Sequence, residues 1–499
     1  MKRFIESCIN TITMYRLVLY SLVFIAAIAL ILSAVGVLKL PFVGLIISLM
    51  TLVITSYAAS KVFAWIFSAK YNRESWTITA LILFFLLLPI RNGKDLLAAV
   101  IVAVIAVASK YILAYRQRHI FNPAAIAVVV SGLVGAAHPG WWIATPYLLP
   151  VVGITGLLIA WKVCHFAMVA TYIGVATITA LAVALINNYP FAGELSLLYL
   201  SSPIVFAACI MLTEPLTSPS TRKWRLIYAA LVGFLTTSQF IPFMTPELAI
   251  IIGNIFVFIV GQKGALAFEF IEAKTIAPRT LEIVMRPVRR FTFKPGQYLE
   301  LSLPHSQEDA RGARRTFSIA SSPHDEYVRL GLTISDPGSS FKKALVNLKK
   351  GAVVHAARVG GDFTLPASLN EPLLLIAGGI GVTPFRSMLD DLVRRNEIRD
   401  IVLIYGARSE ESLVYEDIFT EARAKLNLLY IPIISEASSS WGGEAGVITF
   451  EMISHHVKDL SKRKIYISGP SLMVEGLQSQ LTRGGIQRNR IVKDYFSGY

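Results

Sequence analysis

The sequence predicts a multi-domain chain in which a polytopic, all-α membrane domain precedes an antiparallel β-barrel domain and an α/β domain with a parallel sheet. Three observations lead to this fold class. Almost all of the long apolar runs lie before Gln262. After it, Leu281, Ile283 and Met285 recur at the two-residue period of a half-buried strand. From Leu373 onward, short apolar runs alternate with helical patterns, which is typical of a parallel sheet covered on both faces. The strands predicted there are Leu373–Ala377, Ile401–Tyr405, Leu428–Ile434 and Ile465–Ser468.

Composition limits the class of protein further. The predicted domains cover residues 1–262, 263–368 and 369–499. The formal net charge is +15, and it does not indicate nucleic acid as a partner, because membrane proteins keep Lys and Arg in their cytoplasmic loops. The chain has three cysteines, whereas a plant-type iron–sulfur cluster needs four. We therefore expect no iron–sulfur cluster, no disulfide framework and no metal site.

Ten apolar segments are predicted to lie in membrane lipid. A bilayer core of roughly 30 Å needs about 20 helical residues, and the third, fifth, eighth and tenth segments are shorter than that. They occupy matching positions in two successive groups of five, which predicts an inverted repeat of five plus five spans with broken helices. The segments are Leu17–Leu38, Phe42–Ser68, Thr77–Ile90, Asp95–Tyr115, Asn122–Ala137, Trp141–Ala160, Cys164–Ile186, Leu200–Thr213, Trp224–Phe240 and Glu247–Gly261.

The distribution of charge predicts the orientation of these segments. With both chain ends on the cytoplasmic side, the inside loops contain twelve Lys and Arg residues and the outside loops contain three. This is the bias of the positive-inside rule. The sequence therefore predicts a multi-pass protein of the cytoplasmic membrane, with both C-terminal domains on the cytoplasmic side.

Two proline motifs interrupt the apolar segments. One contains Asn122 and Pro123, and the other contains Thr213, Glu214 and Pro215. Each proline removes a backbone donor and breaks a helix where it falls. Either the motifs simply end helices at the membrane surface, with Glu214 solvated, or they form a polar site in the membrane domain.

The stretch from Leu373 to Pro384 has the pattern of a buried strand, a glycine turn and the start of a helix. Gly378, Gly379 and Gly381 fall within four residues of one another. Such a turn lets backbone N–H groups and a helix N-terminus face a pyrophosphate, although Gly-Gly-x-Gly alone also fits any tight strand-to-helix turn. The helix that follows is predicted from the spacing of Phe385, Met388, Leu389 and Leu392.

Four motifs in order resemble the ferredoxin–NADP reductase family, over about residues 263–499. They are Arg315-Thr316-Phe317-Ser318, the glycine turn up to Pro384, Ser468-Gly469-Pro470, and an aromatic chain end from Asp494 to Tyr499. The resemblance implies that an FAD-binding barrel precedes an NAD(P)H-binding α/β domain. It also implies an NAD(P)H-dependent flavin oxidoreductase.

In the FAD domain the resemblance implies a role for each motif residue. Arg315 is expected to pair with the FAD pyrophosphate, whereas its neighbour Arg314 is better read as a surface arginine. Phe317 is expected to stack on the isoalloxazine, unless it is plain barrel core, and Ser318 to form a hydrogen bond near the flavin N5. The other FAD-binding residues expected are Tyr298, Gly338, Ser339 and Ser340.

In the third domain the resemblance implies a nicotinamide site at the ends of two strands. Ser468 takes the position at which relatives place a cysteine beside the nicotinamide C4, and Ser318, Thr383 and Ser468 are the candidate catalytic residues. Phe496 or Tyr499 is expected to cover the far face of the flavin, unless the chain end is disordered. The other dinucleotide contacts are expected from Gly378, Gly379, Gly381, Pro384, Gly469 and Pro470.

The sequence leaves the choice between NADH and NADPH open. Arg408 is a candidate cofactor-binding residue, because Arg408 and Ser409 lie where relatives contact the adenosine ribose, and this favours NADPH. Glu410 and Glu411 come directly after them and favour NADH.

The membrane half resembles a membrane protein of the Rnf electron-transport complexes and its counterpart in the sodium-pumping NADH:quinone reductase, over about residues 1–262. The likeness lies in a Phe-Asn-Pro-Ala stretch ending at Ala124 and a Thr-Glu-Pro-x-Thr-Ser-Pro stretch starting at Thr213. Those proteins carry FMN on a threonine in a Ser-Gly-Ala-Thr stretch, which this sequence lacks. The polar site expected here, for a non-covalent flavin or a quinone, comprises Asn122, Pro123, Thr213, Glu214 and Pro215.

Ferric reductases and NADPH oxidases also join a flavin reductase to a helical bundle. They need paired histidines on facing helices as haem ligands. The membrane half has only His119, His138 and His165, each near the end of a predicted segment, so we expect no haem.

These observations predict a membrane-bound oxidoreductase that takes hydride from NAD(P)H onto FAD and passes electrons to a membrane acceptor. Quinone or a second, non-covalent flavin is the expected acceptor. Two alternatives stay open: a redox-driven Na⁺ or H⁺ transporter, and an anchored reductase that serves a soluble flavodoxin- or ferredoxin-like partner. The expected partners are membrane lipid and an electron acceptor, with room for further subunits.

Overall fold

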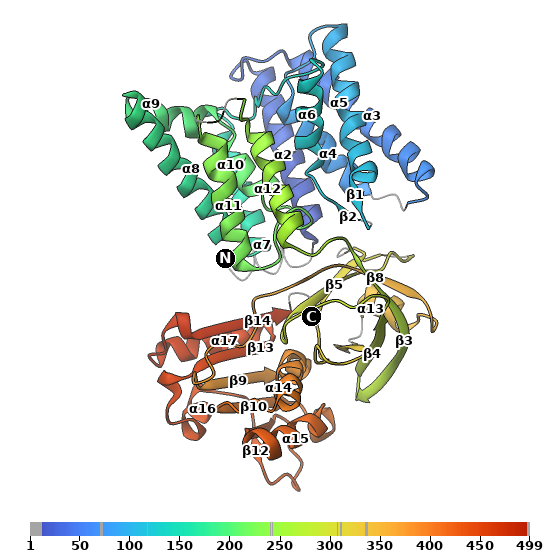
Figure 1. The fold of residues 1–499 in the computed structure, drawn as a ribbon, viewed down its shortest axis with the longest axis vertical. Coiled ribbons are helices and arrows are strands. Elements are labelled where there is room, and N and C mark those ends of the chain that lie inside the picture. The colour runs from blue at the N-terminus through green and yellow to red at the C-terminus, as the bar shows by residue number, and fades with distance from the viewer. Residues whose placement is uncertain are drawn as a thin grey trace. The chain divides into compact units, whose positions relative to one another are not determined.

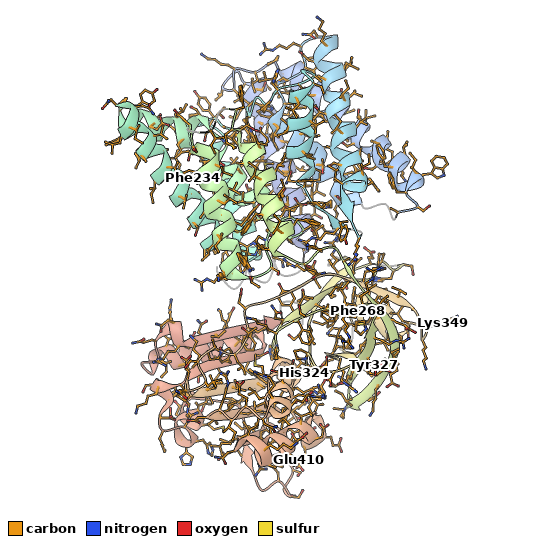
Figure 2. The ribbon with its side chains drawn as sticks, in the orientation of Figure 1. Phe234, Phe268, His324, Tyr327, Lys349 and Glu410 are labelled. Atoms are coloured by element: carbon orange, nitrogen blue, oxygen red, sulfur yellow. The ribbon has the colours of Figure 1, made fainter. Side chains whose placement is uncertain are left out.

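A computed structural model describes residues 12–69, 73–116, 118–239, 241, 243–306, 308–309, 312–334 and 338–496 (Figure 1). The chain divides into two compact units, Met1–Ala265 and Leu266–Tyr499. The first unit is helical, and the second contains two six-stranded sheets. Figure 2 shows the side chains of both units as sticks on the same ribbon.

The first unit alternates long helices with short or broken ones. A two-stranded ribbon, β1 (Ala114–Tyr115) and β2 (Arg118–His119), connects α5 to α6. The helices are α2 (Met14–Ala34), α3 (Phe42–Ile66), α4 (Arg73–Leu86), α5 (Gly93–Ile112), α6 (Pro123–Leu133), α7 (Leu149–Lys162), α8 (Phe166–Asn187), α9 (Phe191–Ser196), η1 (Leu197–Ser201), α10 (Ile204–Phe206), η2 (Ala207–Met211), α11 (Arg222–Thr237) and α12 (Pro246–Val260).

Several of these helices are compatible with a membrane domain. In the part of the chain that the structure describes, α2, α3, α5 and α8 are long and apolar enough to cross a membrane. The bent pair Phe191–Ser201 and Ile204–Met211 is a fifth candidate, with 57° between its halves. The ten-span count therefore stays a prediction. The shorter apolar helices are Glu74–Leu86, Pro123–Leu133, Leu149–Lys162 and Pro246–Val260.

The sixth and eighth apolar segments differ from their predicted bounds. The sixth becomes helical only at Leu149, because Trp141 (φ 39°) and Trp142 lie in a turn held by other elements. Gly140 and Trp141 both donate their backbone N–H to the Leu86 carbonyl at the end of α4. The eighth segment starts at Phe191 and breaks at Pro203, which has no N–H to continue the helix.

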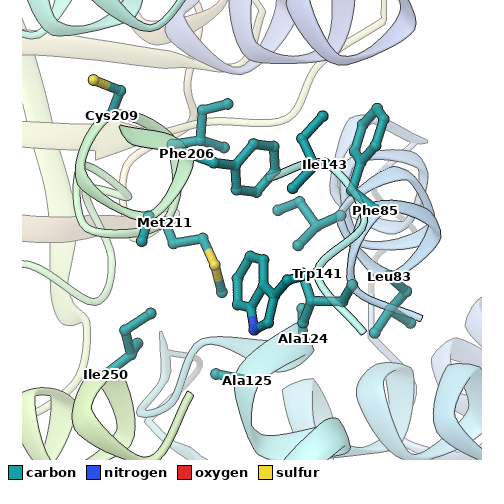
Figure 3. Close-up of a cluster of buried hydrophobic side chains, with 14 of the residues drawn as sticks. Leu83, Phe85, Ala124, Ala125, Trp141, Ile143, Phe206, Cys209, Met211 and Ile250 are labelled. Atoms are coloured by element: carbon teal, nitrogen blue, oxygen red, sulfur yellow. The ribbon is translucent and has the colours of Figure 1, made fainter. Parts of the chain in front are cut away.

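Aromatic and sulfur-containing side chains fill the centre of the first unit. Figure 3 shows the Trp141 indole between Met211 and Ala124. The Trp141 ring centroid lies 6.1 Å from that of Phe206, and the Phe85 ring centroid lies 5.8 Å from that of Phe206. The broken segment of α10 and η2 is therefore packed against the turn at Trp141 and the end of α4.

The first sheet of the second unit is antiparallel, in the order β6-β5-β8-β3-β4-β7. The expected alternation is present, since Ile283, Met285, Leu299 and Leu301 are all buried in one core. An isolated bridge between Ile319 and Leu330 joins the chain after β6 to β7, the opposite edge strand. Closure into a barrel stays a prediction. The strands are β3 (Leu266–Ala277), β4 (Thr280–Pro287), β5 (Tyr298–Ser302), β6 (Arg314–Ser318), β7 (Val328–Thr333) and β8 (Val353–Gly360), and the helix α13 (Ser340–Val346) lies between β7 and β8.

The second sheet is fully parallel, in the order β12-β11-β10-β9-β13-β14. The four strands predicted from apolar runs are β9 (Leu373–Gly378), β10 (Ile401–Ala407), β11 (Leu429–Ile434) and β13 (Lys464–Pro470). The edge strands β12 (Glu444–Ala445) and β14 (Ile491–Phe496) were not predicted.

Helices cover both faces of the parallel sheet, as expected from its continuous apolar strands. Side chains of α14 (Thr383–Arg395) and α15 (Glu416–Leu426) belong to the core on one face. Those of α16 (Phe450–His456) and α17 (Ser471–Arg483) belong to the core on the other face.

Candidate active site

The glycine turn forms the strand-to-helix connection that the sequence predicts. Gly379 begins the 3₁₀ turn η3 (Gly379–Val382) with a φ of +52°, a backbone conformation that residues other than glycine rarely adopt. At Gly381, a Cβ would lie 2.6 Å from the Ser468 carbonyl oxygen, so only glycine fits. Thr383 begins α14 and donates its hydroxyl to the Ile380 carbonyl at 2.9 Å, and Pro384 follows in the first turn. The turn and β13 are therefore in direct contact.

Ser468 lies beside this turn near the end of β13. Its side chain is fully buried, and among the described residues its hydroxyl oxygen has no hydrogen-bond partner. Leaving a buried hydroxyl unsatisfied costs roughly 1–3 kcal/mol. Gly469 and Pro470, the next residues of the motif, complete β13. A buried hydroxyl without a partner marks Ser468 as a group that a ligand can satisfy.

Asp494 on β14 contacts Ser318 of the first sheet and is the register neighbour of Ser468 in the second sheet. The Asp494 carboxylate on β14 lies 3.4 Å from the Ser318 hydroxyl at the end of β6. In the β13–β14 register, Asp494 is the partner of Ser468. Asp494 was not among the predicted site residues, and the only signal for it was its place at the start of the aromatic chain end.

Arg315 forms an ion pair with Asp309 beside the start of α13. Its guanidinium lies 2.7 Å from an Asp309 oxygen and 3.5 Å from the Ser339 hydroxyl, and it faces the Phe341 ring at 5.4 Å. The second Asp309 oxygen accepts the backbone N–H of Ser340 at 3.3 Å. The structure thus brings together the predicted residues Arg315, Ser339 and Ser340, with Gly338 directly before them, and adds Asp309, which the sequence did not indicate.

Polar contacts from α14 join the two sheets. Arg386 donates to the Ala320 carbonyl at 2.7 Å, and the Ser387 hydroxyl donates to the Ser321 carbonyl at 2.6 Å. At Gly331 on β7, a Cβ would lie 2.6 Å from the Thr383 side chain and 2.9 Å from the Tyr415 hydroxyl. Burial, and then the charge of Glu282, raise the pKa of Tyr415 well above its usual value, so this hydroxyl stays neutral. These contacts fix the position of Thr383 relative to the first sheet.

The C-terminal part of the chain is similar to known oxidoreductases. Residues 375–479 match the family model of the oxidoreductase NAD-binding domain. An NAD(P)H-flavin reductase of Vibrio harveyi is 30% identical over 223 residues, which is 42% of this chain and 91% of that protein. A ferredoxin–NADP reductase B of Sorangium cellulosum is 30% identical over 240 residues, covering 44% of this chain and 95% of that reductase. The chain belongs to the ferredoxin–NADP reductase family.

A third relative is the reductase component of a propane 2-monooxygenase from Mycolicibacterium goodii. It is 27% identical over 238 residues, which is 45% of this chain and 67% of the relative. The chain is thus an NAD(P)H-dependent flavin oxidoreductase, and its residues fit FAD and NAD(P)H. The first 262 residues lie outside the family model and are not needed for this assignment.

The remaining residues predicted to bind FAD differ in their surroundings. Phe317 is 6% exposed and its ring lies 6.0 Å from Phe341 in the core of the first sheet, so the core interpretation fits its position. Tyr298 is half-buried and pairs with Ser318 across β5 and β6. Phe496 ends β14, and its side chain, like the whole of Tyr499, lies outside the described part of the chain.

In the first unit the structure brings two predicted residues together. Glu214 accepts hydrogen bonds from the Asn122 amide at 3.1 Å, from Thr217 at 3.2 Å and from the His119 ring at 3.1 Å. Glu214 is therefore enclosed by partners and is not solvated as a free surface carboxylate. Asn254 on α12 accepts the Asn122 backbone N–H at 2.8 Å and closes the cluster. We call His119, Asn122, Glu214, Thr217 and Asn254 the membrane-unit polar cluster.

The other predicted residues of the first unit lie at the start of α6 or in the turn after η2. Pro123 is the first residue of α6. Thr213 is buried and donates its hydroxyl to the Cys209 carbonyl at 2.7 Å, so it does not face Glu214. Pro215 directly follows Glu214 in the turn after η2. Thr217 lies in the Thr-Glu-Pro-x-Thr-Ser-Pro stretch but was not chosen as a site residue, and His119 was considered only as a haem ligand. Asn254 was missed because a single polar residue within an apolar segment gives no pattern.

Proposed function

We propose that this chain is a membrane-bound reductase that takes hydride from NAD(P)H onto FAD and passes electrons to an acceptor in the membrane unit, either quinone or a non-covalent flavin. The observation that supports it most is the membrane-unit polar cluster, in which Asn122 and Glu214 meet within a unit of long apolar helices. Polar groups inside apolar helical bundles are costly and usually serve function.

The FAD site is assigned to residues 263–368. Arg315 and the Ser339–Ser340 backbone would hold the pyrophosphate, which would have to replace the Asp309 carboxylate that Arg315 and the Ser340 N–H contact here. A charged hydrogen bond contributes about 1.5–3 kcal/mol. When bound, FAD supplies a hydride acceptor that can release electrons singly or as a pair. Ser318 would hold its hydroxyl toward the flavin N5, with Asp494 fixing the direction of that hydroxyl. Tyr298 and Phe317 would supply the apolar wall.

The nicotinamide site is assigned to residues 369–499. The N–H groups of the glycine turn and the N-terminus of α14 would face the pyrophosphate of the dinucleotide. Ser468 would donate its buried hydroxyl at the nicotinamide, while Gly381 leaves room for the close approach of the backbone. Asp494 lies 3.4 Å from the Ser318 hydroxyl and can orient it, whereas the Ser468 hydroxyl, which has no partner among the described residues, is left for the nicotinamide.

The arrangement of the first unit supports the likeness to the Rnf membrane protein. The short helices α6 and α12 both start with proline directly after a capping residue, Asn122 and Thr245 respectively. Glu214 closely follows the broken α10–η2 segment and lies next to the start of α6. Short helices paired in this way are typical of inverted repeats with a site near the midplane. The charge bias of the loops supports a cytoplasmic location for the reductase unit.

Two other functions have some support. The repeat architecture also suits a redox-driven Na⁺ or H⁺ transporter. The relative from Mycolicibacterium goodii is the reductase component of a monooxygenase, which favours a reductase anchored to the membrane that serves a soluble partner.

Steady-state assays of the full chain in lipid vesicles distinguish the three. The proposal predicts that NAD(P)H reduces a lipid-soluble quinone, and that Glu214→Gln loses most of this activity while reduction of ferricyanide, a soluble acceptor, is kept. Equal loss with both acceptors, or quinone reduction that Glu214→Gln leaves intact, would rule out the assigned acceptor site. An ion gradient built during turnover identifies the transporter, and activity confined to a flavodoxin identifies the anchored reductase.

A further inference from the structure

The carboxyl ends of β10 and β11 are joined by their backbones. Ala407 ends β10 and is the register partner of Ile434, which ends β11. One residue beyond, Ser435 donates its N–H to the Ala407 carbonyl at 2.9 Å, and Glu436 donates its N–H to the Arg408 carbonyl at 2.8 Å. The side chains of Arg408 and Glu436 therefore leave the sheet from neighbouring points of a fixed frame.

Glu436 forms an ion pair with Arg408, the arginine that favours NADPH in the sequence. The Arg408 Nε lies 2.9 Å from a Glu436 oxygen, and both side chains are mostly exposed, at 74% and 62%. An exposed pair of this kind adds at most about 1 kcal/mol to stability, so fold stability does not explain its presence. Its consequence is electrostatic: the positive charge of Arg408 is already compensated.

Further carboxylates lie at the same edge. Glu410 follows β10 (Figure 2) and accepts a hydrogen bond from the Ser438 hydroxyl, which ties the two loops together. Glu411 is the next residue. Arg408 with Glu410, Glu411 and Glu436 thus gives this edge an excess of negative charge.

The order of the sheet indicates which part of the dinucleotide reaches these residues. β9, with the glycine turn, has β10 and β11 on one side and β13 and β14 on the other. Dinucleotides lie across the carboxyl ends of such strands at this switch in strand order. Ser468, at the end of β13, is assigned to the nicotinamide, so the adenosine half extends over β10 and β11. An acidic residue there accepts a ribose hydroxyl, whereas a free arginine accommodates a 2′-phosphate.

We propose that Glu436 makes this reductase selective for NADH over NADPH. Its carboxylate accepts a hydroxyl of the adenosine ribose, repels a 2′-phosphate, and holds Arg408 in an ion pair so that Arg408 does not bind that phosphate. Glu410 and Glu411 add to the repulsion, since the phosphate brings about −1.5 to −2 charges at neutral pH. This inference rests on the proposed nicotinamide site.

The test compares wild type with Glu436→Gln in the full chain with FAD bound. For wild type, kcat/KM is expected to be at least about fivefold higher with NADH, as one charge interaction at an exposed site allows. Glu436→Gln should raise kcat/KM for NADPH by about fivefold and change that for NADH little. Adding Arg408→Ala to Glu436→Gln should lower the gain, because the freed arginine provides part of it. Glu421→Gln, which breaks an exposed pair with Lys425 on α15, is the matched control.

A binding measurement gives a second readout without turnover. Calorimetry with 5′-AMP and 2′,5′-ADP on the same proteins should show preference for 5′-AMP in wild type and its loss in Glu436→Gln. The inference would be overturned if the wild type preferred NADPH and 2′,5′-ADP. It would also be overturned if the ratio of kcat/KM for NADH to that for NADPH were the same in Glu436→Gln as in Glu421→Gln. If neither NADH nor NADPH bleaches the flavin, the proposed function fails, and the two adenosine ligands still decide the role of Glu436.

Discussion

At the scale of single residues, the site combines residues that the sequence identifies with others that it does not. Arg315, Ser318, Gly381 and Ser468 belong to ordered motifs, so they were expected. Asp494 was not, because its relation to Ser318 depends on β14 joining the sheet beside β13. Asp309 was missed for a similar reason, since a loop carboxylate has no periodicity.

Ser468→Ala separates a functional hydroxyl from a structural one. Because the Ser468 hydroxyl is buried and has no partner among the described residues, its removal should not lower Tm. It should slow NAD(P)H-driven bleaching of the flavin by about fivefold, the loss expected for one neutral hydrogen bond to substrate. Stopped-flow absorbance and thermal unfolding measure the two effects.

Ser387→Ala is the matched control for this variant. Ser387 is also a fully buried serine of the same domain, but its hydroxyl donates to the Ser321 carbonyl at 2.6 Å. Its loss should cost about 1 kcal/mol of stability. A large drop in Tm for Ser468→Ala, with unchanged bleaching, would show that the hydroxyl has a structural partner.

Arg315→Ala tests the phosphate site. Loss of a charge-assisted hydrogen bond of about 1.5–3 kcal/mol should raise the Kd for FAD by roughly tenfold to a hundredfold. Arg314→Ala should change it little, since that side chain lies 3.8 Å from Glu300 and is read as a surface group. Fluorescence titration of the apoprotein with FAD measures both, and equal Kd values for the two variants would refute the assignment.

At the scale of elements, the sequence predicted those whose apolar pattern is continuous. The strands β9, β10, β11 and β13 and the helix α14 follow the expected ranges closely. The edge strand β14 was missed because Lys493 and Asp494 interrupt its apolar residues, as is common at sheet edges. The late start of α7 was missed because the turn at Trp141 depends on acceptors in α4 and α12, Leu86 and Glu247, which lie far away in the sequence.

The starts of short helices in the first unit also give a prediction. The Asn122 side chain accepts the N–H groups of Ala124 and Ala125, and it donates to Glu214. Asn122→Ala should therefore lower stability by more than the roughly 0.5–2 kcal/mol of a lost cap, because Glu214 also loses a partner. Thermal unfolding in detergent measures this.

Asn92→Ala provides the comparison for that experiment. Asn92 caps α5 in the same way, accepting the N–H groups of Lys94 and Asp95, but at an exposed position. Asn92→Ala should lower stability only by the roughly 0.5–2 kcal/mol of the lost cap. Equal decreases in Tm for Asn92→Ala and Asn122→Ala would show that the contact with Glu214 adds nothing.

At the scale of the whole molecule, the chain joins a reductase unit to a helical unit. The reductase unit follows from ordered motifs and from relatives that it covers almost completely. The helical unit follows from apolar length alone, which is why its helices were expected while the polar cluster inside it was only partly anticipated. Composition predicts apolar segments long enough to cross a membrane. The contacts among His119, Asn122 and Glu214 arise instead from packing between segments about a hundred residues apart.

The central claim is that the helical unit receives the electrons that the reductase unit takes from NAD(P)H. Anaerobic absorbance spectroscopy of the full chain with FAD, reconstituted in lipid, tests it most directly. We expect one equivalent of NADH per FAD to bleach the flavin, and a lipid-soluble quinone added afterwards to restore its colour. A flavin that never bleaches, or one that bleaches and stays colourless when the quinone is added, would contradict the claim.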